Sequence, residues 1–286
     1  MVKRILFIFI LLVSSLSFSQ LSKNHYIPPI SSGPSNADPL DQLMYISTPS
    51  QGDVNFTINI VGGNSISGTV SNATPYVYGI ADSGYSSFVQ DPATTSRVTS
   101  DKGYIINADS PIYVSVRLNA GNNAQAGALV SKGENALGTT FRIGTYDNQG
   151  SPGSNYLNFF SFMATEDNTT VNLTNERVTS GLQIQNAGAQ QFPINNISLN
   201  RGQTYVVAVK PEDTNENRAG LIGTLVSSDK PIVVNSGSAN GSFGNGGARD
   251  YGIDQIVELS KVGKEYIFVK GDGDNSFENV LVVAHE

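Results

Sequence analysis

The chain has 286 residues, a formal net charge of −7, only 14% charged residues and no cysteine. This acidic balance argues against a nucleic-acid or anionic-membrane partner, because proteins that bind those surfaces are basic. The missing cysteine excludes a disulfide framework, a thiol nucleophile and cysteine-containing zinc sites.

Residues 1–19 predict a secretory signal peptide. A short basic start precedes an apolar run from Ile5 to Val13, and Ser17 and Ser19 precede a cleavage position before Gln20. The apolar run is far shorter than the roughly 20 residues of a membrane-spanning helix. We therefore expect an extracellular protein, secreted or held at the cell surface, with no membrane span once the signal is removed.

Residues 20–42 predict a lead-in or linker, because they are rich in proline and serine and lack a sustained apolar period. From Leu43 onward short apolar runs alternate, and no segment shows a helical period. We therefore assign residues 43–286 to one all-β repeat domain, which we expect to be incomplete at its C-terminus.

A hairpin-like unit recurs along this domain: an apolar strand, a small or acidic turn and a β-branched strand. The two clearest copies are NADSPIYVSVRL and SSDKPIVVNSGS, whose prolines, Pro111 and Pro231, lie 120 positions apart. The strands after the turns are spaced by 58, 59 and 61 residues and begin at Val54, Ile112, Val171 and Ile232. This spacing indicates a repeat of about 60 residues in which alternate units resemble each other most.

Four short strands per unit predict the blades of a β-propeller, since a single unit cannot bury both faces of its own sheet. The segment FENVLVVAHE at the end matches NFFSFMATED of the third unit, so we expect four blades and the start of a fifth. The alternative is two tandem β-sandwiches of about 120 residues each. That alternative explains the longer period but leaves the match between half-units unexplained.

Histidine placement argues against catalysis. The two histidines, His25 and His285, lie at opposite ends of the chain. A Ser-His-Asp triad would need one of them as its base, and a histidine in a strand is more often packed than catalytic. We therefore predict that the protein is not an enzyme.

Four oxygen-bearing side chains alternate in the glycine-rich stretch KGDGDNSFEN: Asp272, Asp274, Ser276 and Glu278. Hard cations such as Ca²⁺ take six to eight oxygen ligands, and alternate acidic side chains on a tight loop supply several of them. The spacing departs from the helix–loop–helix calcium signature, and a polar hairpin turn is the alternative. The stretch is therefore a candidate Ca²⁺ site.

Two glycine-rich loops, residues 119–127 and 236–252, form the candidate recognition surface. They occupy equivalent positions in alternate units, so we expect them on one rim of the domain, and loops on a rigid β scaffold often carry binding function. The predicted ligand contacts there are polar or aromatic side chains: Arg249, Asp250, Tyr251 and Asp254. Loops that merely connect strands would have the same composition.

Four segments carry a family resemblance: SKGENALGTTFRIGTY, FFSFMATEDNTTVNL, LIGTLVSSDKPIVVNSGS and RDYGIDQIVELSKVGKEYIFV. In this order they resemble the N-terminal domain of IgGFc-binding proteins, and the resemblance runs from about Leu43 to the end. That domain also begins long surface proteins of gliding Bacteroidetes that use type IX secretion. Animal members carry a cysteine near the segment that matches RDYGIDQ, so a chain without cysteine resembles the bacterial branch.

Resemblance and composition together predict a non-catalytic cell-surface module for adhesion or gliding, which presents its loops to a protein or glycan ligand. The family name itself is not an activity of this chain. A carbohydrate-active enzyme on a propeller is one alternative, and it would need carboxylates and aromatic platforms around a central pocket. A structural spacer within a larger adhesin is another, and it would have no concave pocket.

Overall fold

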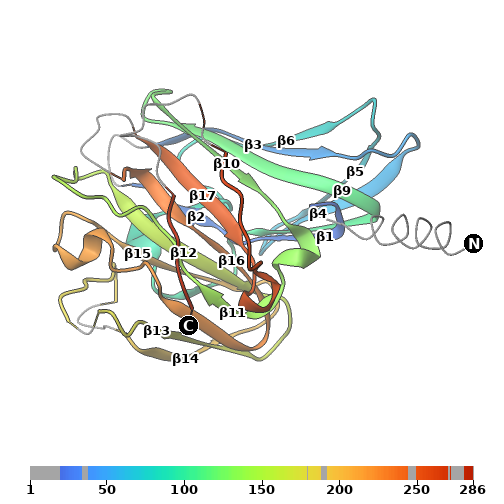
Figure 1. The fold of residues 1–286 in the computed structure, drawn as a ribbon. Coiled ribbons are helices and arrows are strands. Elements are labelled where there is room, and N and C mark those ends of the chain that lie inside the picture. The colour runs from blue at the N-terminus through green and yellow to red at the C-terminus, as the bar shows by residue number, and fades with distance from the viewer. Residues whose placement is uncertain are drawn as a thin grey trace, which may run out of the picture.

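The computed structural model describes residues 20–33, 38–178, 180–187, 192–243, 249–269, 271 and 280–285. The fold is all-β with four short 3-10 turns (Figure 1). The strands of the first half are β1 (Ser22–Ile27), β2 (Ile30–Ser31), β3 (Pro39–Ser47), β4 (Val54–Ile60), β5 (Ser65–Val70), β6 (Tyr76–Ser83), β7 (Val89–Gln90), β8 (Val98–Thr99), β9 (Tyr104–Ala120) and β10 (Gln125–Val130). Those of the second half are β11 (Gly138–Arg142), β12 (Leu157–Ala164), β13 (Thr169–Thr174), β14 (Ile194–Leu199), β15 (Thr204–Val209), β16 (Leu225–Gly241) and β17 (Asp250–Ile256). The 3-10 turns are η1 (Pro92–Thr94), η2 (Gly133–Ala136), η3 (Glu216–Arg218) and η4 (Leu259–Lys261).

Hydrogen bonding divides most of these strands between a seven-stranded and an eight-stranded sheet, which lie side by side in Figure 1. The first sheet has the order β5-β4-β9-β3-β6, with β1 and β10 also paired to β9. The second has the order β14-β13-β16-β12-β15-β8, with β11 and β17 also paired to β16. The short strands β2 and β7 pair with each other in parallel.

Apart from β8, the two sheets repeat the same arrangement. The strands β1, β3, β4, β5, β6, β9 and β10 correspond in turn to β11, β12, β13, β14, β15, β16 and β17. We call residues 22–130 unit 1 and residues 138–256 unit 2. The structural period is therefore about 120 residues, the period of the tandem-sandwich alternative, but each unit is one nearly closed, barrel-like sheet rather than a sandwich of two sheets. The described strands do not form the four four-stranded blades of the expected propeller.

Each unit is organised around one 17-residue strand, β9 or β16. The first half of β9 pairs with β4 and its second half with β3, and β16 pairs in the same way with β13 and β12. The turns expected near Pro111 and Pro231 are therefore bends within continuous strands, where the pairing partner changes. Proline fits there because it has no N–H to donate to a neighbour. The 60-residue half-units are half-sheets that share this strand and wrap into a nearly closed, barrel-like layer.

The same hydrogen bond marks both bends. Thr48 Oγ1 donates to the carbonyl oxygen of Pro111 at 3.0 Å, and Thr165 Oγ1 donates to that of Pro231 at 2.6 Å. Each threonine directly follows the strand that pairs with the second half of the long strand. The repeat thus extends from strand order to individual side-chain contacts.

The outer face of unit 2 completes the core of unit 1. Every residue of β12 and β15 is buried, as expected for strands covered on both faces. On β12, Phe160 and Phe162 belong to the core of unit 2, whereas Leu157 and Phe159 pack into the core of unit 1. The two units therefore form one body with a shared apolar interface.

The lead-in expected over residues 20–42 is part of the fold rather than a linker. β1 pairs with β9, and β3 begins at Pro39, before the expected boundary at Leu43. Residues 26–29 lie against unit 2, whose side chains donate to their backbone carbonyls. Asn235 Nδ2 donates to Pro28 O at 2.8 Å, and Gln255 Nε2 donates to Tyr26 O at 2.8 Å. These bonds satisfy polar groups that the interface buries.

Two of the sequence predictions lie outside the described residues. They are the signal peptide over residues 1–19 and the candidate Ca²⁺ ligands, Asp272, Asp274, Ser276 and Glu278. Within the part of the chain that the structure describes, no helix has the length and apolar character needed to cross a membrane.

Candidate binding site

The described strands that adjoin the two glycine-rich stretches, β10 and β17, lie next to each other, whereas residues 244–248 of the second stretch lie outside the described residues. β10 contacts β17, and the backbone N–H of Ala126 donates to Asp250 Oδ1 at 2.8 Å. We use the term rim for the loop of residues 121–124 together with Arg249 and Asp250. Unit 1 supplies the turn of residues 121–124 and unit 2 supplies Arg249 and Asp250, so the rim forms only because unit 2 packs on unit 1.

The loop of unit 1 is a defined turn. Gly121, Asn122 and Asn123 have φ values of 57°, 59° and 65°, in the left-handed region that glycine and asparagine tolerate best. Outside the turn, Asn119 Nδ2 donates to Asp41 Oδ2 at 3.2 Å. The local sequence GNN therefore fixes the shape of this side of the rim.

Arg249 and Asp250 place opposite charges side by side on the rim. The Arg249 guanidinium lies over the Tyr156 ring, 4.8 Å from its centroid, an interaction of about 0.5–1 kcal/mol at exposed sites. Among the described residues, Arg249 Nε is buried without a hydrogen-bond partner. Arg249 as a whole is half-buried, and a cation held over a ring in this way is suited to a carbonyl or carboxylate of a ligand.

The structure places the other two predicted contacts elsewhere. Tyr251 is only 5% exposed and belongs to the core of unit 1. A Cβ added at Gly127 would lie 2.6 Å from Tyr251 Cβ, so this glycine makes room for the tyrosine. Burial raises the pKa of the Tyr251 phenol. Tyr251 therefore joins the two units and does not present its ring at the rim.

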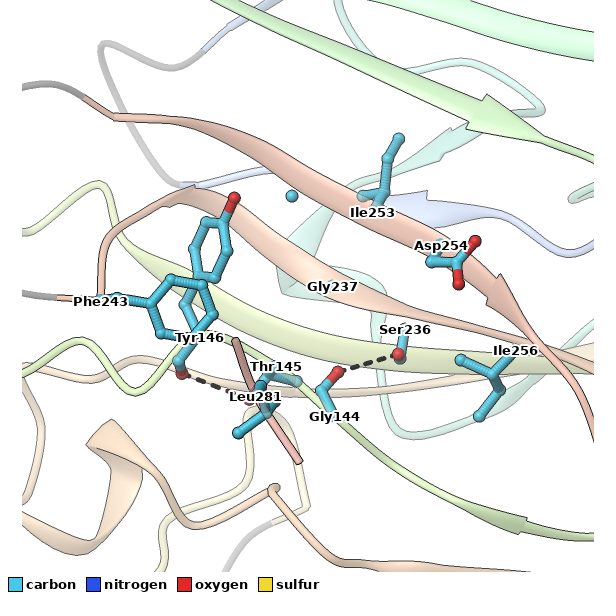
Figure 2. Close-up of a pocket in the computed structure, with 11 residues that line it drawn as sticks. Gly144, Thr145, Tyr146, Ser236, Gly237, Phe243, Ile253, Asp254, Ile256 and Leu281 are labelled. Carbon is cyan, nitrogen blue, oxygen red and sulfur yellow. Dashed lines mark hydrogen bonds between the residues drawn. The ribbon is translucent and has the colours of Figure 1, made fainter. Parts of the chain in front are cut away.

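Asp254 lines a groove of about 340 Å³ on unit 2 (Figure 2). Its carboxylate forms an ion pair with Lys132 Nζ at 2.8 Å, and such exposed pairs contribute about 0–1 kcal/mol. The groove is lined by Gly144, Thr145, Tyr146, Ser236, Gly237, Phe243, Gly252, Ile253, Asp254, Ile256 and Leu281. This volume is near the lower end for small-ligand sites, which span about 300–1,000 Å³.

Tyr146 and Phe243 form one wall of the groove, as Figure 2 shows, with ring centroids 4.6 Å apart in an edge-to-face arrangement. The backbone N–H of Tyr146 donates to Ser238 Oγ at 3.0 Å. Burial raises the pKa of the Tyr146 phenol, and the Asp250 carboxylate raises it further. The hydroxyl is therefore protonated at neutral pH and available as a donor.

Sequence reasoning did not single out Tyr146, Phe243 or Leu281. These residues come from the segments after β11, β16 and β17, which are far apart in the chain. The sequence holds one sign of this contact, the glycine at position 252. A Cβ added at Gly252 would collide with the Tyr146 ring. A glycine in a strand often marks such a close approach.

The described residues hold no group of three or more His, Asp or Glu side chains that could bind a metal. His25 is fully buried in β1, and its ring nitrogens contact Ser131 Oγ and the carbonyl oxygens of Ser22 and Ile112. His285 Nδ1 accepts a hydrogen bond from Arg142 Nε at 3.1 Å.

The amino-acid sequence matches one known protein family. A family model described as IgGFc binding protein matches residues 126–286, more than half of the chain. The chain belongs to the IgGFc-binding protein family. The match begins in β10 and includes all of unit 2, the groove, Arg249 and Asp250. No curated protein and no solved structure matches the chain. Membership in the IgGFc-binding family indicates a binding module.

Proposed function

We propose that this IgGFc-binding family member is an exported, non-catalytic module of the cell surface whose rim binds a protein or glycan ligand. The observation that carries the proposal is the family match over residues 126–286, because that region supplies Arg249 and Asp250. The basic start and apolar run of residues 1–19 support export.

Adhesion or gliding in a bacterium of the Bacteroidetes, after type IX secretion, is the finer form of this proposal. It is supported by the resemblance to bacterial surface proteins and by the absence of cysteine. Loops that follow strands on a rigid scaffold suit such a role, since they vary without disturbing the core.

Binding arrays test the proposal. The mature chain from Gln20 would be applied to immobilised extracellular proteins, including immunoglobulin Fc, and to a glycan array. We expect saturable binding to a restricted set of ligands, which Arg249→Ala weakens at least about tenfold, the loss expected for a central arginine contact.

Arg117→Ala is the matched control, since Arg117 stacks on Tyr45 at 5.2 Å on the outer face of unit 1. Its ligand binding should equal that of the unmodified chain. Equal losses in both variants, or full binding by Arg249→Ala, would place the binding surface elsewhere. Cleavage of an arrayed glycan would favour the carbohydrate-active enzyme, and an array without any binding would favour the spacer.

A further inference from the structure

The groove on unit 2 lies at positions that belong to the apolar core in unit 1. Val116 pairs with Leu129 across β9 and β10, and Ser236, 120 positions after Val116, pairs with Asp254 across β16 and β17. Directly paired residues of antiparallel strands share one face of the sheet, so Ser236 and Asp254 correspond to Val116 and Leu129. Val116 and Leu129 are buried in the core of unit 1, whereas Ser236 and Asp254 line the groove.

A third residue of the groove follows the same rule. Ser22 at the start of β1 and Gly138 at the start of β11 each lie opposite the residue that directly follows the proline of the bend. Eight residues further along the chain, Ile30 therefore corresponds to Tyr146. Ile30 is fully buried in the core of unit 1, and Tyr146 lines the groove. Three apolar core positions of unit 1 thus carry a hydroxyl or a carboxylate in unit 2.

The groove offers hydrogen-bonding groups without a net charge. Lys132 Nζ lies 2.8 Å from each oxygen of the Asp254 carboxylate, so the two charges balance. The Ser236 hydroxyl donates to Gly144 O at 2.9 Å, which leaves its oxygen as an acceptor. The Tyr146 phenol, whose pKa is raised by burial, is a protonated donor. An uncharged ligand with several donors and acceptors therefore fits these groups better than an ion does.

An aromatic wall stands beside these polar groups. Tyr146 and Phe243 meet edge to face, as Figure 2 shows, and Ile253 and Ile256 complete the apolar part of the lining. A sugar ring has the same mixed character, because its C–H faces are apolar and each of its hydroxyls both donates and accepts. The volume of about 340 Å³ fits one small ligand rather than a polymer.

We propose that the groove is a second binding site, separate from the rim, for one residue of an uncharged saccharide. Asp254 and Ser236 accept hydrogen bonds from the sugar hydroxyls, the Tyr146 hydroxyl donates one, and the aromatic wall packs against a C–H face. An apolar partner of the kind that covers the core of unit 1 would remove the Asp254 carboxylate from water without replacing its hydrogen bonds, which is costly. The proposal goes beyond the proposed function, because it requires neither Arg249 nor Asp250.

Saturation-transfer NMR titrations of the mature chain from Gln20 test this site. The probes are the methyl glycosides of neutral hexoses and N-acetylhexosamines. We expect at least one of them to bind with a dissociation constant of about 0.1–10 mM, as is usual for a ligand of about 15 heavy atoms.

Two substitutions locate the bound sugar. Asp254→Ala should weaken binding at least about tenfold, because a hydrogen bond to a charged group is lost. Ser236→Val installs the side chain that unit 1 carries at this position, and it should weaken binding about three- to tenfold. Asp254 is exposed, so its substitution should leave the fold unaffected, which circular dichroism checks.

Asp109→Ala is the matched control. Asp109 is an exposed carboxylate that lines a groove of about 290 Å³ on unit 1, where it accepts a hydrogen bond from Asn55 Nδ2 at 2.7 Å. Its sugar binding should equal that of the unmodified chain.

The absence of binding by every glycoside at about 50 mM, well above the expected dissociation constants, would overturn the proposal. Binding that survives both Asp254→Ala and Ser236→Val, or that Asp109→Ala weakens to the same extent, would overturn it as well. The same titration with Arg249→Ala separates the two sites. If Arg249→Ala abolished binding and Asp254→Ala did not, the sugar would belong to the rim and the groove proposal would be wrong. None of these results decides whether the rim binds a ligand of its own.

Discussion

At the scale of single residues, His25 shows how the fold uses a polar side chain as structure. It lies in β1 with no exposed surface, and its Nε2 lies 3.0 Å from Ile112 O. Its Nδ1 lies 3.0 Å from Ser131 Oγ, which in turn lies 3.1 Å from Gln255 Oε1 of unit 2. A buried network of this kind orders a core only when every member is satisfied. The histidine therefore helps to fix unit 1 against unit 2.

Burial lowers the pKa of His25 below 6.5, and the carbonyl contacts and Glu134 oppose this shift without cancelling it. The unfolded chain consequently binds a proton more readily than the folded chain, so stability is highest above pH 6.5 and falls as pH drops toward the lowered pKa. We expect the urea midpoint to be lower at about pH 5.5 than at about pH 7.5.

His25→Gln is the variant that isolates this effect. It should lose stability at both pH values, because the packing changes, but its midpoints should move much closer together. If the variant kept the full pH dependence of the unmodified chain, another group would be responsible.

At the scale of elements, the two bent strands are the defining feature of the fold. The bends at Pro111 and Pro231 allow one strand to serve two half-sheets, and Thr48 and Thr165 hold the carbonyl oxygens at these bends. The strand order on either side is the same in both units. Each bend is therefore a local structure that the chain uses twice.

Thr48→Val and Thr165→Val remove the hydroxyl and keep the shape of the side chain. Each should lower the free energy of unfolding by about 1 kcal/mol, because a partly buried carbonyl loses its side-chain donor. Urea unfolding measures the change, with Thr170→Val on the outward side of β13 as a control that should be nearly neutral. Equal losses at all three threonines would mean that the bends are held by other contacts.

Much of the strand arrangement could be predicted from the sequence. The apolar runs LNFFSFMA and TYVVAV of β12 and β15 indicate strands buried on both faces, and the 120-residue match of the DSP and SDKP segments indicates the repeat. Both segments look like turns, because acidic residues and proline favour turns locally. Long-range pairing with β3 and β12 makes them bends instead, and sequence alone does not show which partners compete.

The candidate site was predictable in part. Equivalent positions in the repeat predicted that the stretches around β10 and β17 lie together, which requires only the period of the sequence, and the Ala126–Asp250 hydrogen bond shows this contact. The period does not show which face of β17 another unit covers, so Tyr251 could not be assigned to the interface. Tyr146 and Phe243 meet across the groove from separate loops, and no local pattern links them.

At the scale of the whole molecule, the two units share one interface rather than standing as separate domains. Leu157, Phe159, Val206, Ala208 and Tyr251 of unit 2 lie in the core of unit 1. The rim depends on this packing, because unit 1 supplies the turn of residues 121–124 and unit 2 supplies Arg249 and Asp250. Separate unfolding of the units would expose this shared core, which costs free energy in proportion to its apolar area.

Differential scanning calorimetry of the mature chain, together with Phe159→Ala and Phe162→Ala, tests this architecture most directly. Phe159 lies in the shared interface and Phe162 in the core of unit 2. We predict one cooperative transition in all three proteins, with both substitutions lowering its midpoint, since a Phe→Ala change in a core costs about 3–5 kcal/mol. Two transitions in the unmodified chain, or a Phe159→Ala protein that melts like the unmodified chain, would contradict a shared core.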